Sequence, residues 1–264
     1  MSQRIKKIFQ KKSKKLISFT TAGDPDLETS IKILDILNNN QVDIIEIGMP
    51  FSDPMADGPT IQLSSNRAIK NGINLDNIFF ICNKVREINT DIPIILMGYY
   101  NLIYHYGIKN FVAKCKEYNV DGLIIVDLQP EEDPDLMFEL KKNNIDLIRL
   151  IAPTTDKERL KLILNNASGF LYYVTITGIT GQKSANIEEL NKTIQEIKQL
   201  TSLPIVAGFG IKNKDHVSEI CKYADGAVVG SAIVKIIEEN IDDKNKMIDL
   251  IDNFTKELKS GTLK

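Results

Sequence analysis

The stretch VDIIEIGMPFSDPMADGPT, residues 42–60, joins an apolar segment to a loop rich in turn-forming residues. Its β-branched residues fall on both faces of the predicted pleat, which is typical of a parallel strand covered on both sides. They are Val42, Ile44, Ile45 and Ile47. A carboxylate in such a strand is costly to bury unless it is paired, hydrogen-bonded or facing a polar cavity. The presence of Glu46 in this strand therefore requires an explanation.

Similar apolar segments recur along the 264 residues, with helical patterns between them. They predict eight strands, at residues 16–21, 42–48, 93–99, 120–127, 145–151, 169–176, 204–210 and 226–231. Helices are predicted at residues 27–40, 60–70, 76–89, 108–118, 134–143, 153–165, 187–200 and 214–221, and a charged amphipathic helix follows the last strand. This alternation indicates an α/β fold with a parallel sheet.

The absence of a linker favours one domain, residues 1–264, folded as a single (β/α)8 TIM barrel. A doubly wound open sheet would need a GxGxxG turn after the first strand, where this chain has TTAGD instead. Apolar residues at helical spacing within the basic start of the chain predict an extra N-terminal helix. They are Ile5, Ile8 and Phe9.

Composition narrows the functional classes. The formal net charge of −2 gives no electrostatic reason to expect nucleic acid or an anionic membrane as a partner. No segment approaches the ~20 continuous apolar residues of a membrane span. The three cysteines, Cys82, Cys115 and Cys221, have neither metal-ligand nor disulfide spacing, which indicates reduced thiols. We expect a soluble, cytoplasmic protein.

Two carboxylates fall where a barrel would place its active site, at the C-terminal ends of the strands. Glu46 lies near the end of the second predicted strand, and Asp57 lies in the loop that follows. If the face shared with Ile44 points inward, Glu46 projects into the mouth of the barrel. The structural alternative is a salt-bridged Glu46 on the outer face and an Asp57 that only forms an Asp-Gly turn. Spacing alone leaves both interpretations open.

Glycine clusters mark three successive strand ends, at residues 178–181, 208–210 and 230–231. Glycine lets a ligand approach the backbone closely, and free N–H groups at a helix N-terminus bind anions. TIM barrels commonly bind phosphate after their last two strands. The clusters therefore favour a phosphate site over ordinary tight turns.

Apolar and aromatic residues also gather at the predicted rim, although each alone could belong to the core. They are Phe19, Met97, Tyr99, Tyr100, Tyr172 and Phe209. Together with a phosphate site they indicate a flat apolar substrate that carries a phosphate. Neither histidine, His105 or His216, lies at a strand end, and no cluster has metal-ligand spacing. The predicted chemistry is acid–base catalysis by carboxylates without a metal.

Five motifs match one known family in register over essentially the whole chain. They are FTTAGDP at residues 19–25, EIGMPFSDPMADGPTIQ at 46–62, GITG at 178–181, GFGI at 208–211 and GSAIVK at 230–235. The chain thereby resembles the tryptophan synthase α subunits. The 46–62 block is very specific to that family, whereas the glycine motifs are shared with other phosphate-binding barrels.

This resemblance implies a carbon–carbon lyase of tryptophan biosynthesis that splits indole-3-glycerol phosphate into indole and D-glyceraldehyde 3-phosphate. The matching glutamate, Glu46, would move the protons, and the matching aspartate, Asp57, would hold the indole N–H and stabilise positive charge. The resemblance places Phe19, Ile61, Tyr99, Tyr172 and Phe209 around the indole, and Gly181, Gly210, Gly230 and Ser231 on the phosphate. It assigns support of loop closure to Asp127 and Thr180.

The resemblance also implies a partner. The α subunit needs no cofactor, whereas the β subunit uses pyridoxal phosphate, receives indole through a tunnel and forms an α2β2 complex. The loop at residues 49–57 and the loop after Thr177 would sense that partner. Two positions depart from the family pattern: Gln129 stands where proline is common, and Lys183 lies where an arginine is often found nearby. Both concern communication with the β subunit.

Two other functions are compatible with parts of the pattern. A phosphosugar isomerase would use the same glycine clusters, but it would need a His or Lys electrophile at a strand end, and none is found there. A barrel kept only as a binding partner would fit the departures at Gln129 and Lys183, but the intact carboxylate pair argues against it.

Overall fold

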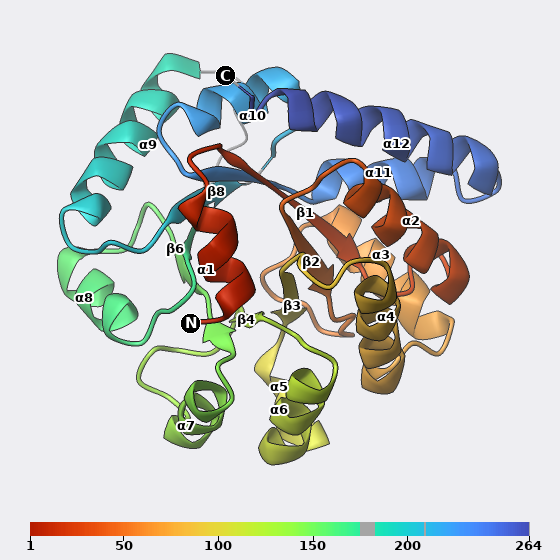
Figure 1. The fold of residues 1–264 in the computed structure, drawn as a ribbon, viewed down its shortest axis with the longest axis horizontal. Coiled ribbons are helices and arrows are strands. Elements are labelled where there is room, and N and C mark those ends of the chain that lie inside the picture. Colours follow the sequence, from red (N-terminus) through yellow and green to blue (C-terminus); the bar gives the residue numbers. More distant parts are fainter. Residues whose placement is uncertain (175–182, 209, 264) are drawn as a thin grey trace.

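The computed structural model describes residues 1–174, 183–208 and 210–263, which form a parallel sheet surrounded by helices (Figure 1). Its strands are β1 (Lys15–Thr21), β2 (Ile44–Gly48), β3 (Ile94–Gly98), β4 (Gly122–Ile125), β5 (Asp146–Leu147), β6 (Arg149–Ile151), β7 (Leu171–Val174), β8 (Ile205–Gly208) and β9 (Gly226–Val229). All the pairings are parallel, and the order is β5-β4-β3-β2-β1-β9-β8-β7-β6.

The two ends of this order are pieces of one predicted strand, which the structure divides at Ile148. The first piece, β5, pairs with β4, and the second, β6, pairs with β7. Between them the Ile148 N–H donates a hydrogen bond to the Leu123 carbonyl at 2.9 Å. The sheet therefore returns to its starting point and closes, which confirms the predicted α/β barrel.

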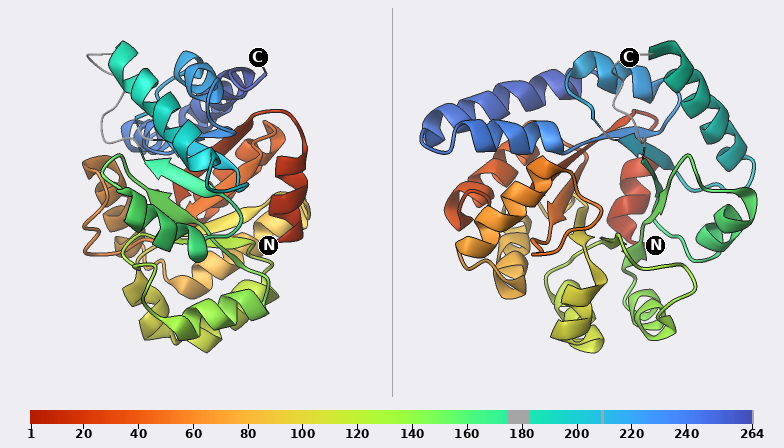
Figure 2. Two further views of the ribbon diagram at one scale, coloured as in Figure 1. Left: turned by 90° about the vertical axis from the view of Figure 1, so that its left-hand side faces the viewer. Right: turned by 180° about the vertical axis from the view of Figure 1, so that it is seen from behind.

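Helices surround the sheet: the first lies across one end of the barrel, and the others cover its outside (Figures 1 and 2). They are α1 (Gln3–Gln10), α2 (Leu27–Asn39), α3 (Pro59–Lys70), α4 (Leu75–Ile88), α5 (Tyr100–Tyr106), α6 (Ile108–Glu117), α7 (Pro134–Lys142), α8 (Lys157–Asn165), α9 (Lys183–Lys198), α10 (Lys214–Cys221), α11 (Ser231–Glu239) and α12 (Lys244–Ser260). Most match the predicted helices within a few residues. Two differences stand out: α5 was not predicted, and the single closing helix is in fact two helices, α11 and α12.

The barrel has two apolar cores. A large outer core lies between the strands and the surrounding helices. A smaller inner core fills the barrel with one inward-facing residue from most strands: Ile17, Ile44, Ile95, Ile124, Ile148, Phe170, Val206 and Val228. Ile5 of α1 joins this inner core and is fully buried. The predicted N-terminal helix is thus confirmed, and it closes the N-terminal end of the barrel (Figure 1).

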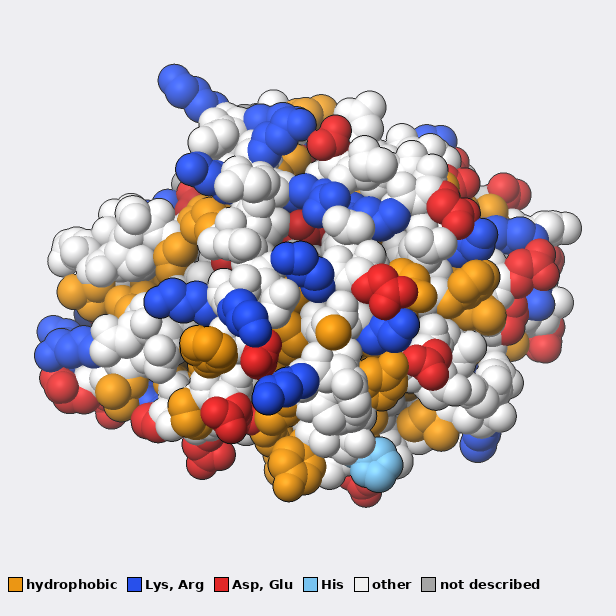
Figure 3. All heavy atoms as spheres, turned by 60° about the horizontal axis from the view of Figure 1, so that its bottom comes forward, with side chains coloured by type: hydrophobic (Ala, Val, Ile, Leu, Met, Phe, Trp, Pro, Cys, Tyr) orange, Lys and Arg blue, Asp and Glu red, His pale blue; other side chains and the backbone are white. Residues whose placement is uncertain are grey.

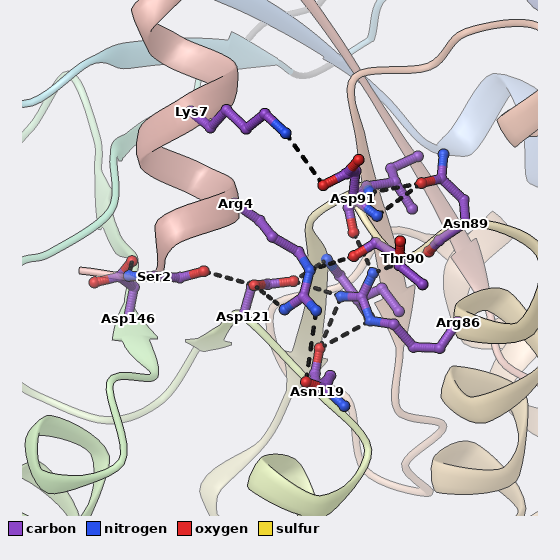
Figure 4. Close-up of polar contacts among 12 residues, drawn as sticks. Ser2, Arg4, Lys7, Arg86, Asn89, Thr90, Asp91, Asn119, Asp121 and Asp146 are labelled. Carbon is purple, nitrogen blue, oxygen red and sulfur yellow. Dashed lines mark hydrogen bonds and ion pairs between the residues drawn. The ribbon is translucent and has the colours of Figure 1, made fainter.

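Two buried aspartates hold α1 in this place (Figure 4). The Asp146 carboxylate accepts from the Ser2 N–H at 2.8 Å. The Asp121 carboxylate, 2% exposed, accepts from the Ser2 hydroxyl at 2.5 Å and from Arg4 Nη1 at 3.2 Å. Its other oxygen pairs with Arg86 Nη2 at 2.6 Å. Because a buried charge needs such partners, these contacts hold α1 against the N-terminal end of the barrel.

The outer surface carries charges of both signs. On the face shown in Figure 3, basic and acidic side chains are interspersed with smaller apolar patches, as expected from a formal net charge of −2. None of the helices in the described part of the chain is both long and apolar enough to cross a membrane.

Candidate active site

Glu46 is the carboxyl group that the strands of the barrel contribute to the site. In β2 it lies between Phe19 of β1 and Ile95 of β3 in register. Its side chain is 2% exposed and lines a cavity at the C-terminal ends of the strands. Among the described residues, no group donates a hydrogen bond to it. Burial, and secondly the negative charge of Asp57, raise the pKa of Glu46 to about 8.

Asp57 reaches the same cavity from the loop between β2 and α3. Its backbone is held on both sides, because its N–H donates to the Pro54 carbonyl at 3.2 Å and its carbonyl accepts from Gln62 Nε2 at 2.7 Å. The Asp57 carboxylate accepts the Tyr99 hydroxyl at 3.1 Å. Burial raises the pKa of Asp57, and the hydrogen bond from Tyr99 opposes that rise.

The cavity between the two carboxylates has a volume of about 190 Å³. Apart from the carboxylates its wall is largely apolar, and the described residues that line it come from nearly every strand end: Phe19, Ala56, Gly58, Ile61, Met97, Val126, Leu150, Tyr172, Val174, Gly210, Ile211, Val228, Gly230 and Ser231. A small aromatic ring with one or two polar groups suits such a site.

The predicted ring-binding residues separate into two groups. Phe19, Ile61 and Tyr172 line the cavity, and burial beside Glu46 raises the pKa of the Tyr172 phenol. Tyr99 is not part of the described lining; it lies behind Asp57. Phe209 lies outside the described residues.

The predicted phosphate residues meet where β8 and β9 end. Gly230 caps α11, and Ser231 is the first residue of that helix, so the free N–H groups of its first turn are positioned to receive an anion. A Cβ on Gly230 would lie 3.1 Å from Phe19, closer than an ordinary van der Waals contact, which favours glycine there. Gly210 has a φ of 69°, which also favours glycine. Gly181 lies outside the described residues.

The predicted loop-support residues are only partly described. Asp127 Oδ1 accepts the Tyr100 N–H at 2.8 Å and so holds the first turn of α5, whereas Thr180 lies outside the described residues. Two other rim residues differ. Met97 lines the cavity, whereas Tyr100 does not, and the Tyr100 hydroxyl donates to Asp133.

Sequence reasoning missed several apolar lining residues. They are Val126, Leu150, Val174, Ile211 and Val228. Alternation along a strand could have identified some of them: Leu150 lies two residues from the inner-core residue Ile148, and therefore on the same face.

Fold and cavity define a class of protein: a TIM-barrel enzyme with two carboxyl groups in a cavity at the C-terminal ends of its strands. Residues 5–263 match the family model described as tryptophan synthase alpha chain. The chain belongs to the tryptophan synthase alpha chain family.

Individual relatives agree with this assignment. The tryptophan synthase alpha chain of Petrotoga mobilis (strain DSM 10674 / SJ95) is 47% identical over 256 residues, covering 97% of this chain and 98% of the relative. That of Geobacter sp. (strain M21) is 42% identical over 264 residues, covering 100% of this chain and 98% of the relative. The crystal structure of tryptophan synthase subunit alpha from Legionella pneumophila str. Paris superposes with a TM-score of 0.91 at 33% identity, covering 99% and 98% of the two chains.

Membership in the family gives the activity. The chain is an indole-3-glycerol-phosphate lyase, a carbon–carbon lyase of tryptophan biosynthesis. An alpha chain of this family needs no cofactor of its own.

Proposed function

We propose that Glu46 and Asp57 divide the lyase reaction between them, with Glu46 as the proton donor and Asp57 as the anion beside the indole nitrogen. One observation carries this proposal: Glu46 is buried in the cavity without a hydrogen-bond donor among the described residues, and this burial raises its pKa to about 8, so that it holds a proton at neutral pH. Asp57 differs because it accepts a hydrogen bond from Tyr99, which favours its ionised form. Burial raises the pKa of Asp57 as well, but the Tyr99 hydrogen bond opposes that rise, so we assign the acid to Glu46 and the anion to Asp57.

In the proposed reaction, Glu46 protonates C3 of the indole ring. The electron pair for the new C–H bond comes from the ring, so positive charge develops at the ring nitrogen, where the ionised Asp57 stabilises it. The Glu46 carboxylate then takes the proton of the glycerol hydroxyl next to the ring. A carbonyl forms at that carbon, the carbon–carbon bond to C3 breaks, and its electron pair restores the aromatic indole. Glu46 ends the cycle protonated, as it began.

The remaining cavity residues would bind the two ends of the substrate. We assign the indole to the apolar wall formed by Phe19, Ile61 and Tyr172. We assign the phosphate to Gly210, Gly230 and Ser231, because the N-terminus of α11 offers both N–H groups and a favourable dipole. Gly181, Phe209 and Thr180 complete this proposal from the sequence alone.

Formation of indole from indole-3-glycerol phosphate tests these roles. We expect Glu46→Gln to abolish indole formation while the circular dichroism spectrum stays that of the wild type. Asp57→Asn should lower kcat by at least about a hundredfold, because it removes the anion that faces the developing charge. Near-normal turnover by Glu46→Gln would refute the assignment of Glu46 as the acid.

We also propose that the chain works with a tryptophan synthase β subunit in an α2β2 complex, where it passes indole on for synthesis of L-tryptophan with pyridoxal phosphate in the β subunit. The similarity to structures of tryptophan synthase from M. tuberculosis supports this, for example the aminoacrylate-bound form at 27% identity and a TM-score of 0.86. Gln129 accepts a hydrogen bond from Arg159, and Lys183 begins α9. We expect these two positions to affect the coupling, measured as indole formation with and without added β subunit.

Two further features complete the proposal. We propose that residues 1–264 fold as one domain, because the barrel uses strands from both halves of the chain in a single sheet. We place the protein in the cytoplasm; the three buried cysteines, all free thiols, are compatible with that reducing compartment.

A further inference from the structure

Tyr99 contacts the loop that carries Asp57 through both its hydroxyl and its ring. It follows β3, its side chain is 2% exposed, and it lies behind Asp57. Its hydroxyl donates to Asp57 Oδ2 at 3.1 Å and accepts from the Ala56 N–H at 3.0 Å. Both hydrogen-bonding directions of the phenol are therefore used, and both lead to the loop that carries Asp57.

The ring of Tyr99 contacts the opposite end of the same loop. It stacks on Phe51 with a centroid distance of 5.1 Å and an interplanar angle of 26°. One buried side chain thus joins the beginning of the loop, through Phe51, to its end, through Ala56 and Asp57. No other side chain in the described part of the chain donates a hydrogen bond to the Asp57 carboxylate.

Tyr99 is itself held from the next strand along the sheet. Asp127, which follows β4, accepts the N–H of Tyr100 at 2.8 Å and so fixes the start of α5. Tyr99 is the residue that caps this helix. A series of contacts therefore leads from Asp127 through the first turn of α5 to Tyr99, and from Tyr99 to Asp57.

We propose that Tyr99 is a positioning residue that orients the Asp57 carboxylate and keeps it ionised, rather than a residue that contacts the indole. The inference rests on the role proposed above for Asp57. A phenol of fixed position that donates to one carboxylate oxygen leaves the other oxygen for the indole N–H. Because the Ala56 N–H orients the Tyr99 hydroxyl, the Asp57 carboxylate is already oriented before the substrate reacts.

Tyr99→Phe tests the proposal, because it keeps the ring and the stacking on Phe51 and removes only the hydroxyl. We expect kcat for indole formation to fall about tenfold, as for loss of one hydrogen bond to a charged group, with KM changed less than about twofold. The acidic limb of the kcat/KM profile should move to higher pH, because the carboxylate that must be ionised loses a donor. The ionisable groups that face this contact are Glu46 of β2 and Asp127, which follows β4.

Two variants separate the hydroxyl from other effects. Phe51→Leu removes the stacking but leaves both hydrogen bonds, so we expect kcat to fall less than about threefold with an unchanged pH profile. Tyr106→Phe is the matched control, because the Tyr106 hydroxyl donates to Asp76 at 2.7 Å outside the cavity. Its kinetics should equal those of the wild type.

Each outcome bears on a definite claim. If Asp57→Asn is inactive while Tyr99→Phe keeps the wild-type kcat and pH profile, the positioning role of Tyr99 is wrong and the function proposed for Asp57 stands. If Tyr99→Phe raises KM and leaves kcat unchanged, Tyr99 binds substrate directly and the inference is again overturned. Normal turnover by Asp57→Asn would overturn both the function of Asp57 and the inference built on it.

Discussion

Replacement of Glu46 by glutamine should stabilise the folded protein, and only at neutral to alkaline pH. Glu46 is buried without a hydrogen-bond donor among the described residues, and its pKa lies at about 8 in the folded chain instead of 4.5. Glutamine keeps the shape of the side chain and stays neutral at every pH. The substitution should therefore remove the free-energy cost of burying an ionised carboxylate in the folded state.

The direction follows from the protons bound in each state. Between pH 4.5 and about 8 the unfolded chain has lost the Glu46 proton while the folded chain retains it, so the wild-type free energy of unfolding falls as pH rises through this window. Above about pH 8 both states are ionised and the loss is complete. The difference between the two pKa values sets an upper limit of about 5 kcal/mol. Glu46→Gln avoids this loss.

Urea unfolding followed by circular dichroism measures the effect at pH 5 and pH 8.5. At pH 5 the two proteins should differ little in their free energy of unfolding, and at pH 8.5 Glu46→Gln should be the more stable by up to about 5 kcal/mol. Glu132→Gln, at an exposed site, is the matched control and should show no such gain. An equal difference at both pH values would show that burial does not raise the pKa of Glu46, and would refute the reasoning.

Three further predictions concern the reaction, the phosphate site and the base of the barrel. The kcat/KM for indole formation should decline above about pH 8 as Glu46 loses its proton, measured from initial rates across the pH range. Gly230→Ala should raise KM about tenfold in the same assay, because its Cβ would lie 3.1 Å from Phe19 and shift the start of α11. Asp121→Ala should lower the free energy of unfolding by about 3–5 kcal/mol in urea, because it leaves Arg86 buried without its partner.

Specific outcomes would contradict these predictions. A rate that stays constant from pH 7 to pH 10 would mean that Glu46 is not the acid, and an unchanged KM for Gly230→Ala would remove Gly230 from the phosphate site. For the base of the barrel the control is Asp91→Ala, which breaks the exposed pair with Lys7 at 3.2 Å and should change stability by less than about 1 kcal/mol. An equal loss of unfolding free energy in Asp121→Ala and Asp91→Ala would contradict the stabilising role of the buried Asp121–Arg86 pair.

The barrel could be predicted from the sequence because its signal is local. A run of β-branched residues that is apolar on both faces describes a strand covered on both sides, and such runs recur between helical patterns. The helix α5 could not be found this way. Its seven residues are too few to form a stable helix alone, and Asp127 from another strand end holds its first turn.

The site was harder to predict because it depends on orientation. Residue spacing placed Glu46 at a strand end but left open whether it pointed into the barrel or outward; the structure turns it into the cavity. The position of Tyr99 at the rim was also predictable, but not that its hydroxyl would point to Asp57. Which way a side chain faces is decided by packing between strands that are distant in the sequence, and no local pattern records it.

In the proposed mechanism, the contrast between the surroundings of Glu46 and Asp57 accounts for the use of two carboxylates in one cavity. A buried carboxyl without a donor keeps its proton, whereas one that receives a phenol hydrogen bond is helped to lose it. In this barrel Glu46 lies in the strand wall and has no described donor, and Asp57 lies in a loop that Tyr99 can reach. The negative charge of an ionised Asp57 further raises the pKa of Glu46 and so helps Glu46 to keep its proton. In the proposed mechanism the unfavourable burial of Glu46 keeps the acid protonated, and the stability gained in Glu46→Gln should measure the cost of that burial.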